Sequence, residues 1–245
     1  MEHHLGLGCS FGVDTGHGSV HQELANKAKA KHFHNWSKEG QGNDYITTML
    51  LRYFAEHPDR KHNTTVSIGW SGMYRHDYIC ESPDVNWQWA RWRADDNSHL
   101  VKELVQHPAY PWAIEFDHIV KLVRNILLTQ SWLSSNNIPY VMYHAIDNSY
   151  QIQTWGVRLK LLEKQINNNS FYQRKTSQHE FCNEHQYWID PTPTAPADVF
   201  PLRSRGNERY NVQDAHPNED GNKQWAEQVW KHILENNLFQ LTKSL

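Results

Sequence analysis

The sequence predicts an α/β fold in which a parallel sheet is covered by helices on both faces. Short apolar segments of strand character alternate along the chain with segments of about 10 to 20 residues of helical character. The length of 245 residues allows one large domain with a proper core. The aromatic content of 12% is far above that of disordered chains. Because parallel strands need crossover helices, we expect a single domain over residues 1–245.

The first three elements predict a strand, a helix and a strand. Residues 3–10 are a short apolar segment that ends in glycine-rich sequence, which is typical of a strand followed by a turn. Residues 20–30 are rich in Ala, Lys and Glu, which favour a helix. Residues 31–37 predict a second strand.

Spacing and side-chain type predict the next four elements. Apolar residues between positions 44 and 57 recur at helical spacing, and Pro58 closes that segment. Residues 64–70 are rich in β-branched side chains and predict a strand. Residues 113–133 carry a broad apolar stripe and predict the longest helix, and residues 138–146 predict a central strand.

Two helices and two insertions complete the prediction. The helices are expected at residues 155–166 and 223–238. Residues 75–112, dense in Trp, and residues 168–213, dense in Pro, do not fit the alternation and are interpreted as insertions between core elements. Inserted loops on this architecture commonly carry binding specificity.

Charge and composition exclude several classes of protein. The chain has 24 Lys and Arg against 27 Asp and Glu, so it lacks the basic surface that nucleic-acid binding requires. We see no secretion signal, and no apolar stretch approaches the ~20 residues that cross a bilayer. Three widely spaced cysteines, Cys9, Cys80 and Cys182, suit a reducing compartment. We therefore expect a cytoplasmic globular protein without nucleic-acid or membrane partners.

Ser10 is the first candidate for chemistry. It lies in Gly8-Cys9-Ser10-Phe11-Gly12, at the carboxyl end of the first predicted strand, where functional residues collect in open α/β sheets. A serine followed by glycines and a helix can expose its hydroxyl and offer backbone N–H groups. Taken alone, the same pattern fits a serine that merely caps a strand-to-helix turn.

The second candidate is Asp214-Ala215-His216-Pro217, just before the last predicted helix. Pro217 suits the first helical position, so we expect His216 at the cap of that helix. A carboxylate two residues earlier can hold one tautomer of the imidazole, which is what a general base needs. A capping role without catalysis is the alternative.

These segments together resemble the SGNH (GDSL-type) hydrolase family. The blocks are Gly8-Cys9-Ser10, Asn35-Trp36-Ser37-Lys38-Glu39-Gly40, Gly69-Trp70-Ser71-Gly72 and Asp214-Ala215-His216-Pro217. They follow the family's order through most of the chain. The Gly-Cys-Ser-Phe start and the Gly40-Gln41-Gly42-Asn43 segment are similar to bacteriophage-encoded members, which would place the protein in a host cytoplasm or a virion.

The resemblance implies a flavodoxin-like three-layer α/β/α sandwich and acyl chemistry at a serine. By position, Ser10 would be the nucleophile, His216 the base and Asp214 the residue that holds the imidazolium. The N–H groups of Ser10 and Gly40 would bind the oxyanion, each worth roughly 3–4 kcal/mol in the transition state. No cofactor is implied.

The sequence departs from the family pattern in three places. The third block usually supplies an Asn to the oxyanion hole, and Ser71 stands there, so Asn43 from a neighbouring loop is a hypothetical replacement. One residue separates Asp214 from His216, where many members have two. Cys9 stands where the family name has Asp, at a position outside the triad.

Other features have simpler interpretations. The 17 histidines include His32 and His34 on one predicted strand with His3 nearby, but no recognisable ligand spacing, so we expect no metal site. The Trp-rich insertion is interpreted chiefly as packing and Arg75 as solvated charge. A stacking or anion-binding role in substrate contact is the alternative for the aromatic and basic residues Trp70, Trp87, Trp89 and Arg75.

Two functions follow. The first is an esterase or deacetylase acting on a small-molecule or glycan ester, such as an acylated carbohydrate, and the retained Ser10, Asp214 and His216 favour it. The second is a weakly active or inactive SGNH-fold interaction protein, such as a phage virion or assembly component. The replacement of the third-block Asn by Ser71 favours that alternative.

Overall fold

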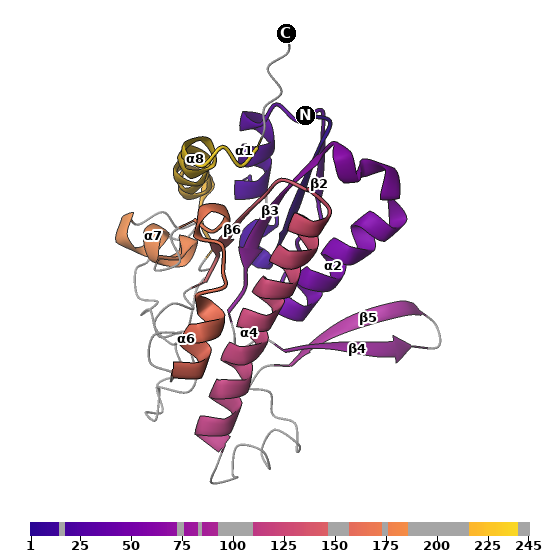
Figure 1. The fold of residues 1–245 in the computed structure, drawn as a ribbon, viewed down its shortest axis with the longest axis vertical. Helices are drawn as coiled ribbons and strands as arrows, with labels where there is room; N and C mark the ends of the chain where they lie inside the picture. The colour runs from indigo at the N-terminus through magenta and orange to yellow at the C-terminus, as the bar shows by residue number, and fades with distance from the viewer. Residues whose placement is uncertain are drawn as a thin grey trace.

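The chain forms a parallel four-stranded sheet with helices on both sides (Figure 1). The computed structural model describes residues 1–14, 18–72, 76–82, 85–92, 110–146, 157–172, 176–185 and 216–239. The sheet order is β2 (His32–Asn35), β1 (His3–Gly8), β3 (Thr64–Trp70) and β6 (Tyr140–His144). The helices are α1 (Val20–Lys27), α2 (Asn43–Glu56), α4 (Tyr110–Ser135), α6 (Val157–Glu163), α7 (Gln178–His185) and α8 (Glu219–Glu235). Three short 3-10 helices are η1 (Ser10–Gly12), η2 (Pro58–His62) and η3 (Asn168–Ser170).

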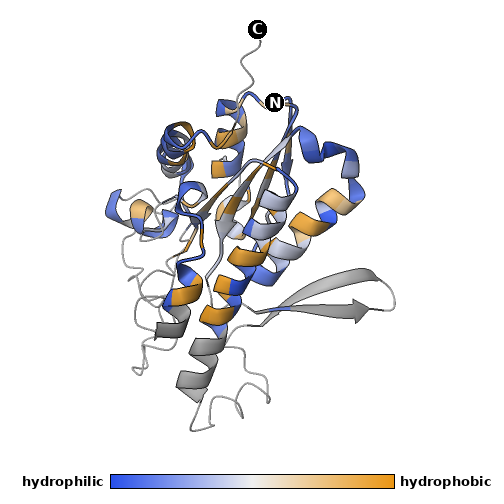
Figure 2. Cartoon of the chain, viewed as in Figure 1, coloured by the Kyte–Doolittle hydropathy of each residue, from blue (hydrophilic) through white to orange (hydrophobic). Residues whose placement is uncertain are grey.

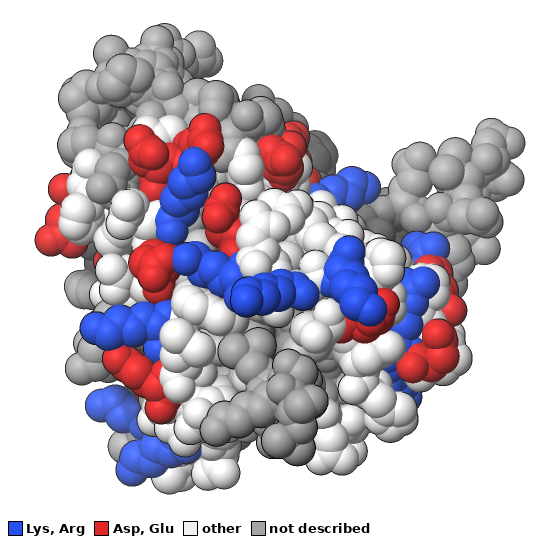
Figure 3. Space-filling view, turned by 90° about the horizontal axis from the view of Figure 1, so that it is seen from above, with Lys and Arg blue, Asp and Glu red and all other residues white. Residues whose placement is uncertain are grey.

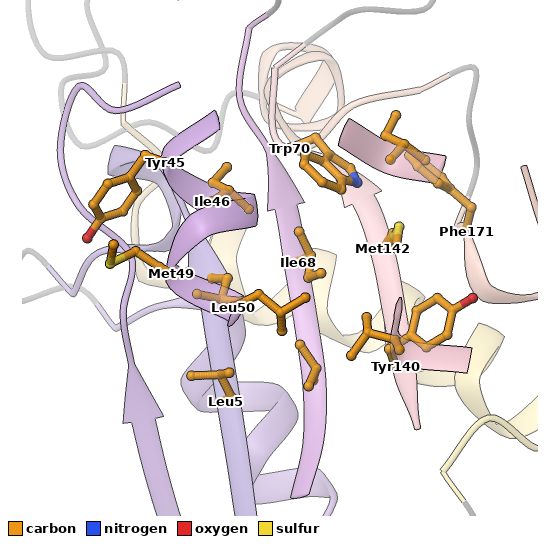
Figure 4. Close-up of a cluster of buried hydrophobic side chains, with 14 of the residues drawn as sticks. Leu5, Tyr45, Ile46, Met49, Leu50, Ile68, Trp70, Tyr140, Met142 and Phe171 are labelled. Carbon is orange, nitrogen blue, oxygen red and sulfur yellow. The ribbon is translucent and has the colours of Figure 1, made fainter. Parts of the chain in front are cut away.

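One face of the sheet is apolar and is covered by α2 and α4. In α2 the buried positions Ile46, Met49, Leu50 and Tyr53 recur at helical spacing, as the sequence predicts. Figure 4 shows Ile46, Met49 and Leu50 near Leu5 and Ile68 of the sheet and, farther along, Trp70, Tyr140 and Met142. Figure 2 shows apolar residues along both helices. This layer holds the larger of the two cores described here.

The opposite face carries polar side chains and glycines, and α1 and α8 cover it. On β1 and β3 the residues of this face include His4, Thr65 and Ser67, all fully buried or nearly so. The apolar core of this side is formed farther out, where α1 and α8 pack against each other and against the β6 residues Val141 and Tyr143. The molecule is therefore a three-layer α/β/α arrangement, as predicted.

The two edges of the sheet differ. At the β6 edge the following chain adds parallel bridges from Phe171 to Met142 and from Ser177 to His144. The Tyr172 N–H also donates to the Met142 carbonyl at 2.8 Å. The opposite edge is β2, which has only four residues.

The predicted insertions contain regular structure that the sequence analysis did not assign. An antiparallel hairpin of β4 (His76–Ser82) and β5 (Val85–Trp92) lies within residues 75–112, and α7 lies within residues 168–213. On the face seen in Figure 3, Lys and Arg side chains intermingle with Asp and Glu. Over the described ranges, no helix is long and apolar enough to span a membrane.

Candidate active site

Ser10 lies in a tight turn at the carboxyl end of β1, an inner strand of the sheet. The Gly12 N–H donates to the Cys9 carbonyl at 2.9 Å, and the Val13 N–H donates to the Ser10 carbonyl at 3.2 Å. These bonds close η1, and Ser10 is only 7% exposed. The predicted candidate Ser10 thus lies at the carboxyl ends of the parallel strands, where open α/β proteins place their functional groups.

The loop from β2 to α2 follows the Ser10 turn and is bonded to it. The Trp36 and Lys38 N–H groups donate to the carbonyls of Gly6 and Gly8 at 2.9 and 3.2 Å. The Asn35 Nδ2 group donates to the Gly12 carbonyl at 2.8 Å. Asn35 therefore joins the first two sequence blocks, a role that the sequence analysis did not assign to it.

Gly40, which lies in this loop shortly before α2, has a backbone conformation that suits glycine. Its φ of 71° lies in the left-handed region, which costs a residue with a Cβ atom free energy. Gly40 is buried, and its N–H is one of the predicted oxyanion donors. The backbone geometry at this position therefore favours glycine, whatever the chemistry of the neighbouring side chains.

Asn43, the first residue of α2, and Ser71, which follows β3, are neighbours. The Asn43 Oδ1 atom accepts from the Ser71 N–H at 2.9 Å, and Asn43 Nδ2 donates to the Ser71 carbonyl at 3.2 Å. Both residues are buried. The pair of bonds fixes the amide plane of Asn43, and an amide nitrogen carries a second N–H for a further acceptor.

Asp77, at the base of the hairpin, binds the first turn of α2. Its carboxylate accepts from the Gly42 N–H at 2.6 Å and from the Tyr45 N–H at 2.8 Å. A carboxylate at a helix N-terminus satisfies N–H groups that have no partner within the helix, and it interacts favourably with the helix dipole. Asp77 thus ties the hairpin to the segment that carries Asn43, and no sequence signal predicted this contact.

His216 lies beside the Ser10 turn. Its half-buried ring is 5.6 Å, centroid to centroid, from the ring of Phe11, the residue after Ser10. The ring of His179, at the start of α7, approaches Phe11 at 6.1 Å. The predicted base and the neighbour of the predicted nucleophile therefore meet, and His179 is an additional imidazole that the sequence analysis missed.

The prediction that His216 caps α8 was wrong. The cap is Asn218, whose Oδ1 accepts from the Gly221 N–H at 2.9 Å, and the helix begins at Glu219. Asn is among the strongest capping side chains because its short carbonyl reaches the first-turn N–H groups. His216 and Pro217 therefore precede the capping residue of the helix.

The remaining predicted site residues divide into two groups. Asp214 and Arg75 lie outside the described residues, and so do the side chains of Trp87 and Trp89. Trp70, by contrast, is fully buried in the core beneath α2 and α4 (Figure 4). Its indole therefore packs against the protein and contacts no solvent.

Histidines also lie close together on the neighbouring strands β1 and β2, where His3 and His32 begin the strands. His3 Nδ1 and His34 Nε2 lie 3.1 Å apart, and the His3 ring stacks on His32 at 5.1 Å. Burial and the nearby Arg60 lower the pKa of His34 to about 4. Across the described ranges, no three His, Cys, Asp or Glu side chains are arranged to hold a metal ion.

Comparisons with known proteins find similarity in structure alone. No family model matches the chain, and no curated protein matches it in sequence. Among solved structures, a psychrotrophic esterase from Pseudoalteromonas has 10% identity and a TM-score of 0.48, covering 96% of this chain and 98% of its own. A putative lipolytic protein of the G-D-S-L family from Desulfitobacterium hafniense has 10% identity and a TM-score of 0.46, covering 95% and 99%.

A third solved structure is a GDSL-like lipase from Bacteroides thetaiotaomicron. It has 12% identity and a TM-score of 0.45, covering 97% of this chain and 89% of its own. The descriptions of two of these three structures name the GDSL type, which is the family that the sequence blocks resemble. At these identities and scores, the likeness assigns no activity and no residue role to this chain.

Proposed function

We propose that this protein is a serine hydrolase of the SGNH type that cleaves a carboxylic ester. The observation that supports the proposal is the approach of the His216 ring to Phe11, the residue after Ser10, although the two segments come from opposite ends of the chain. Ser10 ends an inner strand, and the His216 ring contacts the adjacent Phe11. Acyl transfer requires a nucleophile and a base near each other, and the proposal assigns these roles to Ser10 and His216 at the carboxyl ends of the parallel strands.

In the proposed reaction, Ser10 Oγ attacks the carbonyl carbon of the ester while His216 takes the hydroxyl proton. The tetrahedral intermediate collapses to an acyl-enzyme when His216 returns that proton to the leaving alcohol. Water then attacks the acyl-enzyme with the same base, releasing the acid and free Ser10. Asp214 would hold the imidazole and stabilise its charged form.

The oxyanion would be bound by N–H groups at the start of α2 and at Ser10. The Ser10 and Gly40 N–H groups are the backbone donors, and the second N–H of Asn43 is the side-chain donor that replaces the missing third-block Asn. Because Ser71 fixes the Asn43 amide through two bonds, that amide is preorganised. The Ser71 hydroxyl is the remaining candidate.

The proposal for the substrate class rests on the amino-acid sequence of the first insertion. We propose an acylated small molecule or glycan, with Trp87, Trp89 and Arg75 as candidate contacts because aromatic faces stack on sugar rings. The mixed charges on the face of Figure 3 offer no basic surface for a nucleic acid.

The experiment compares wild type with Ser10→Ala and with Ser135→Ala, an exposed serine at the end of α4. Each is treated with a fluorophosphonate probe, digested and analysed by mass spectrometry, and each is assayed with p-nitrophenyl acetate. We expect labelling at Ser10 and turnover in wild type and Ser135→Ala only. Labelling at another residue would overturn the assignment of the nucleophile.

The base is tested in the same assays by His216→Ala, with exposed His62→Ala as the control. We expect His216→Ala to lose as much activity as Ser10→Ala, since members of a triad act as a unit. Near-normal turnover in His216→Ala would refute the base. A folded wild type that neither labels nor turns over acetyl esters or acetylated glycans would instead support the inactive interaction protein.

A further inference from the structure

His21, in the first turn of α1, occupies the space that side chains would otherwise fill at three glycines. A Cβ atom added at Gly6 would lie 2.5 Å from His21 Cβ, and one added at Gly12 would lie 2.7 Å from His21 Nε2. At Gly8 the corresponding distance to Nε2 is 3.2 Å. Gly8 and Gly12 stand two residues before and two residues after Ser10. The imidazole of His21 therefore forms the floor of the Ser10 turn.

A chain of hydrogen bonds fixes the orientation of this ring. His21 Nδ1 lies 2.7 Å from Ser67 Oγ, which lies 2.8 Å from His4 Nε2. His4 Nδ1 lies in turn 2.9 Å from Thr65 Oγ1. All four side chains are buried on the polar face of the sheet. Since Ser67 sits behind the ring, it aims the opposite nitrogen, Nε2, at the turn.

The protons of this chain have two self-consistent arrangements. A hydroxyl carries one proton and a neutral imidazole carries one N–H. If His21 Nδ1 donates to Ser67, then Ser67 donates to His4 and Nε2 of His21 is an acceptor. If the direction is reversed, Nε2 is a donor. Burial lowers the pKa of both His4 and His21 to about 3, which keeps both rings neutral.

Two buried polar atoms remain at the floor of the turn. Among the described residues, neither His21 Nε2 nor Ser37 Oγ has a hydrogen bond of ordinary geometry, although the Leu7 backbone interacts with the His21 ring and opposes part of the fall in its pKa. A Cβ atom at Gly12 would lie within 2.7 Å of both, so the two atoms border the same point of the turn. Buried polar atoms without a well-formed hydrogen bond are uncommon in native proteins. Both atoms also adjoin the loop that Asn35 and Lys38 bond to the turn.

We propose that His21 is a positioning residue for Ser10, and that its ring, oriented by Ser67, supports the Gly8–Gly12 turn by packing against it with Nε2 facing the turn and Ser37. The part of this inference that concerns activity rests on the proposed function. The part that concerns the turn does not, because it predicts the local stability of the turn whether or not the protein hydrolyses esters. If the His21 ring only filled space, it would not matter which of its two nitrogens faces the turn.

The test uses a matched pair of variants, His21→Gln and His21→Asn. The amide of Gln reaches the position of Nε2, and the amide of Asn, which is one methylene group shorter, reaches only that of Nδ1, so the two variants separate these positions. We expect His21→Asn to lower kcat by about tenfold or more with little change in KM, because small misplacements of a reacting group are costly. His21→Gln should retain most of kcat.

A second measurement does not depend on activity. Hydrogen exchange with mass spectrometry should show faster exchange over residues 8–13 in His21→Asn, and near wild-type exchange in His21→Gln. His62→Asn serves as the control for an exposed histidine. If a His21 variant fails to fold, Ser67→Ala is used instead, since it leaves the ring and the turn intact but removes the group that aims the ring.

The outcomes separate the two hypotheses. Wild-type kcat and wild-type exchange in His21→Asn, or in Ser67→Ala where that variant is used, would overturn the positioning role. Equal losses in His21→Asn and His21→Gln would also overturn it, because ring volume would then suffice. An inactive wild type in which exchange still divides the Gln and Asn variants would refute the proposed hydrolase and support the role of His21 in the turn.

Discussion

The contact between Asp77 and α2 makes a quantitative prediction. Its carboxylate accepts from the N–H groups of Gly42 and Tyr45 at 2.6 and 2.8 Å. Losing a capping side chain typically costs about 1 kcal/mol and up to about 2. The helix dipole adds roughly 0.3–1 kcal/mol for a charged group. Because Asp77 is half-buried and water partly replaces it, we expect Asp77→Ala to lower the free energy of unfolding by about 2 kcal/mol.

The assay is urea unfolding followed by circular dichroism, with a thermal scan as a check. For a chain of this size, about 2 kcal/mol corresponds to a fall in Tm of roughly 4–8 °C. Asp77→Asn keeps one carbonyl acceptor, so its loss should be about 1 kcal/mol. The control is Asp59→Ala, an exposed carboxylate, which we expect to stay within about 0.5 kcal/mol of wild type.

The contact also predicts which backbone amides lose protection from hydrogen exchange in Asp77→Ala. Hydrogen exchange at Gly42 and Tyr45 should accelerate in Asp77→Ala, since the carboxylate is their partner in the first turn. Esterase activity should fall as well, because this turn carries Asn43. A loss of stability no larger than that of Asp59→Ala, with unchanged exchange over residues 42–45, would refute the capping role.

Three further predictions concern protons, packing and surface charge. Burial lowers the pKa of His4 and His21 to about 3 from 6.5, so the unfolded state binds more protons and stability should fall as pH drops from about 6.5 towards 3. At pH 5 the cost is on the order of 2 kcal/mol for each ring, and urea titrations at pH 7 and 5 should show a smaller difference in His4→Gln. Gly12→Ala places a Cβ atom 2.7 Å from His21 Nε2, so we expect a loss of about 1–3 kcal/mol in urea unfolding and weaker fluorophosphonate labelling; wild-type labelling would contradict the crowded turn. Glu227→Gln breaks a surface pair with Lys27 and should change stability by less than about 1 kcal/mol; a larger loss in the same titration would show that the pair matters more than its exposure indicates.

The sequence predicted the main layers because their elements satisfy local rules. The strand at residues 64–70 matches β3, since its β-branched residues and burial agree. The helix at residues 44–57 corresponds to α2, whose apolar residues follow the helical period. Ser10 was singled out because it ends a predicted strand among glycines and because the later sequence blocks follow it in the order of a known family, since the serine alone fits a turn equally well.

The missed features depend on contacts between distant segments. The hairpin carried a local signal, the alternation of Val85, Trp87 and Trp89 with other residues, which was interpreted as packing within an insertion. Nothing near Asp77 in the sequence indicates that it binds α2. The role of His21 depends on its packing against the glycines of β1 and of the Ser10 turn, and these residues come next to its ring only in the folded chain.

The bridges from Phe171 and Ser177 to β6 bear on how the protein behaves at high concentration. An open strand edge presents unpaired N–H and carbonyl groups to which another chain can add a strand. At the β6 edge, the carbonyls of Met142 and Ala145 accept from Tyr172 and His179 of the same chain. The other edge, β2, is only four residues long and carries two histidines. The four-stranded sheet therefore offers little template for edge-to-edge association.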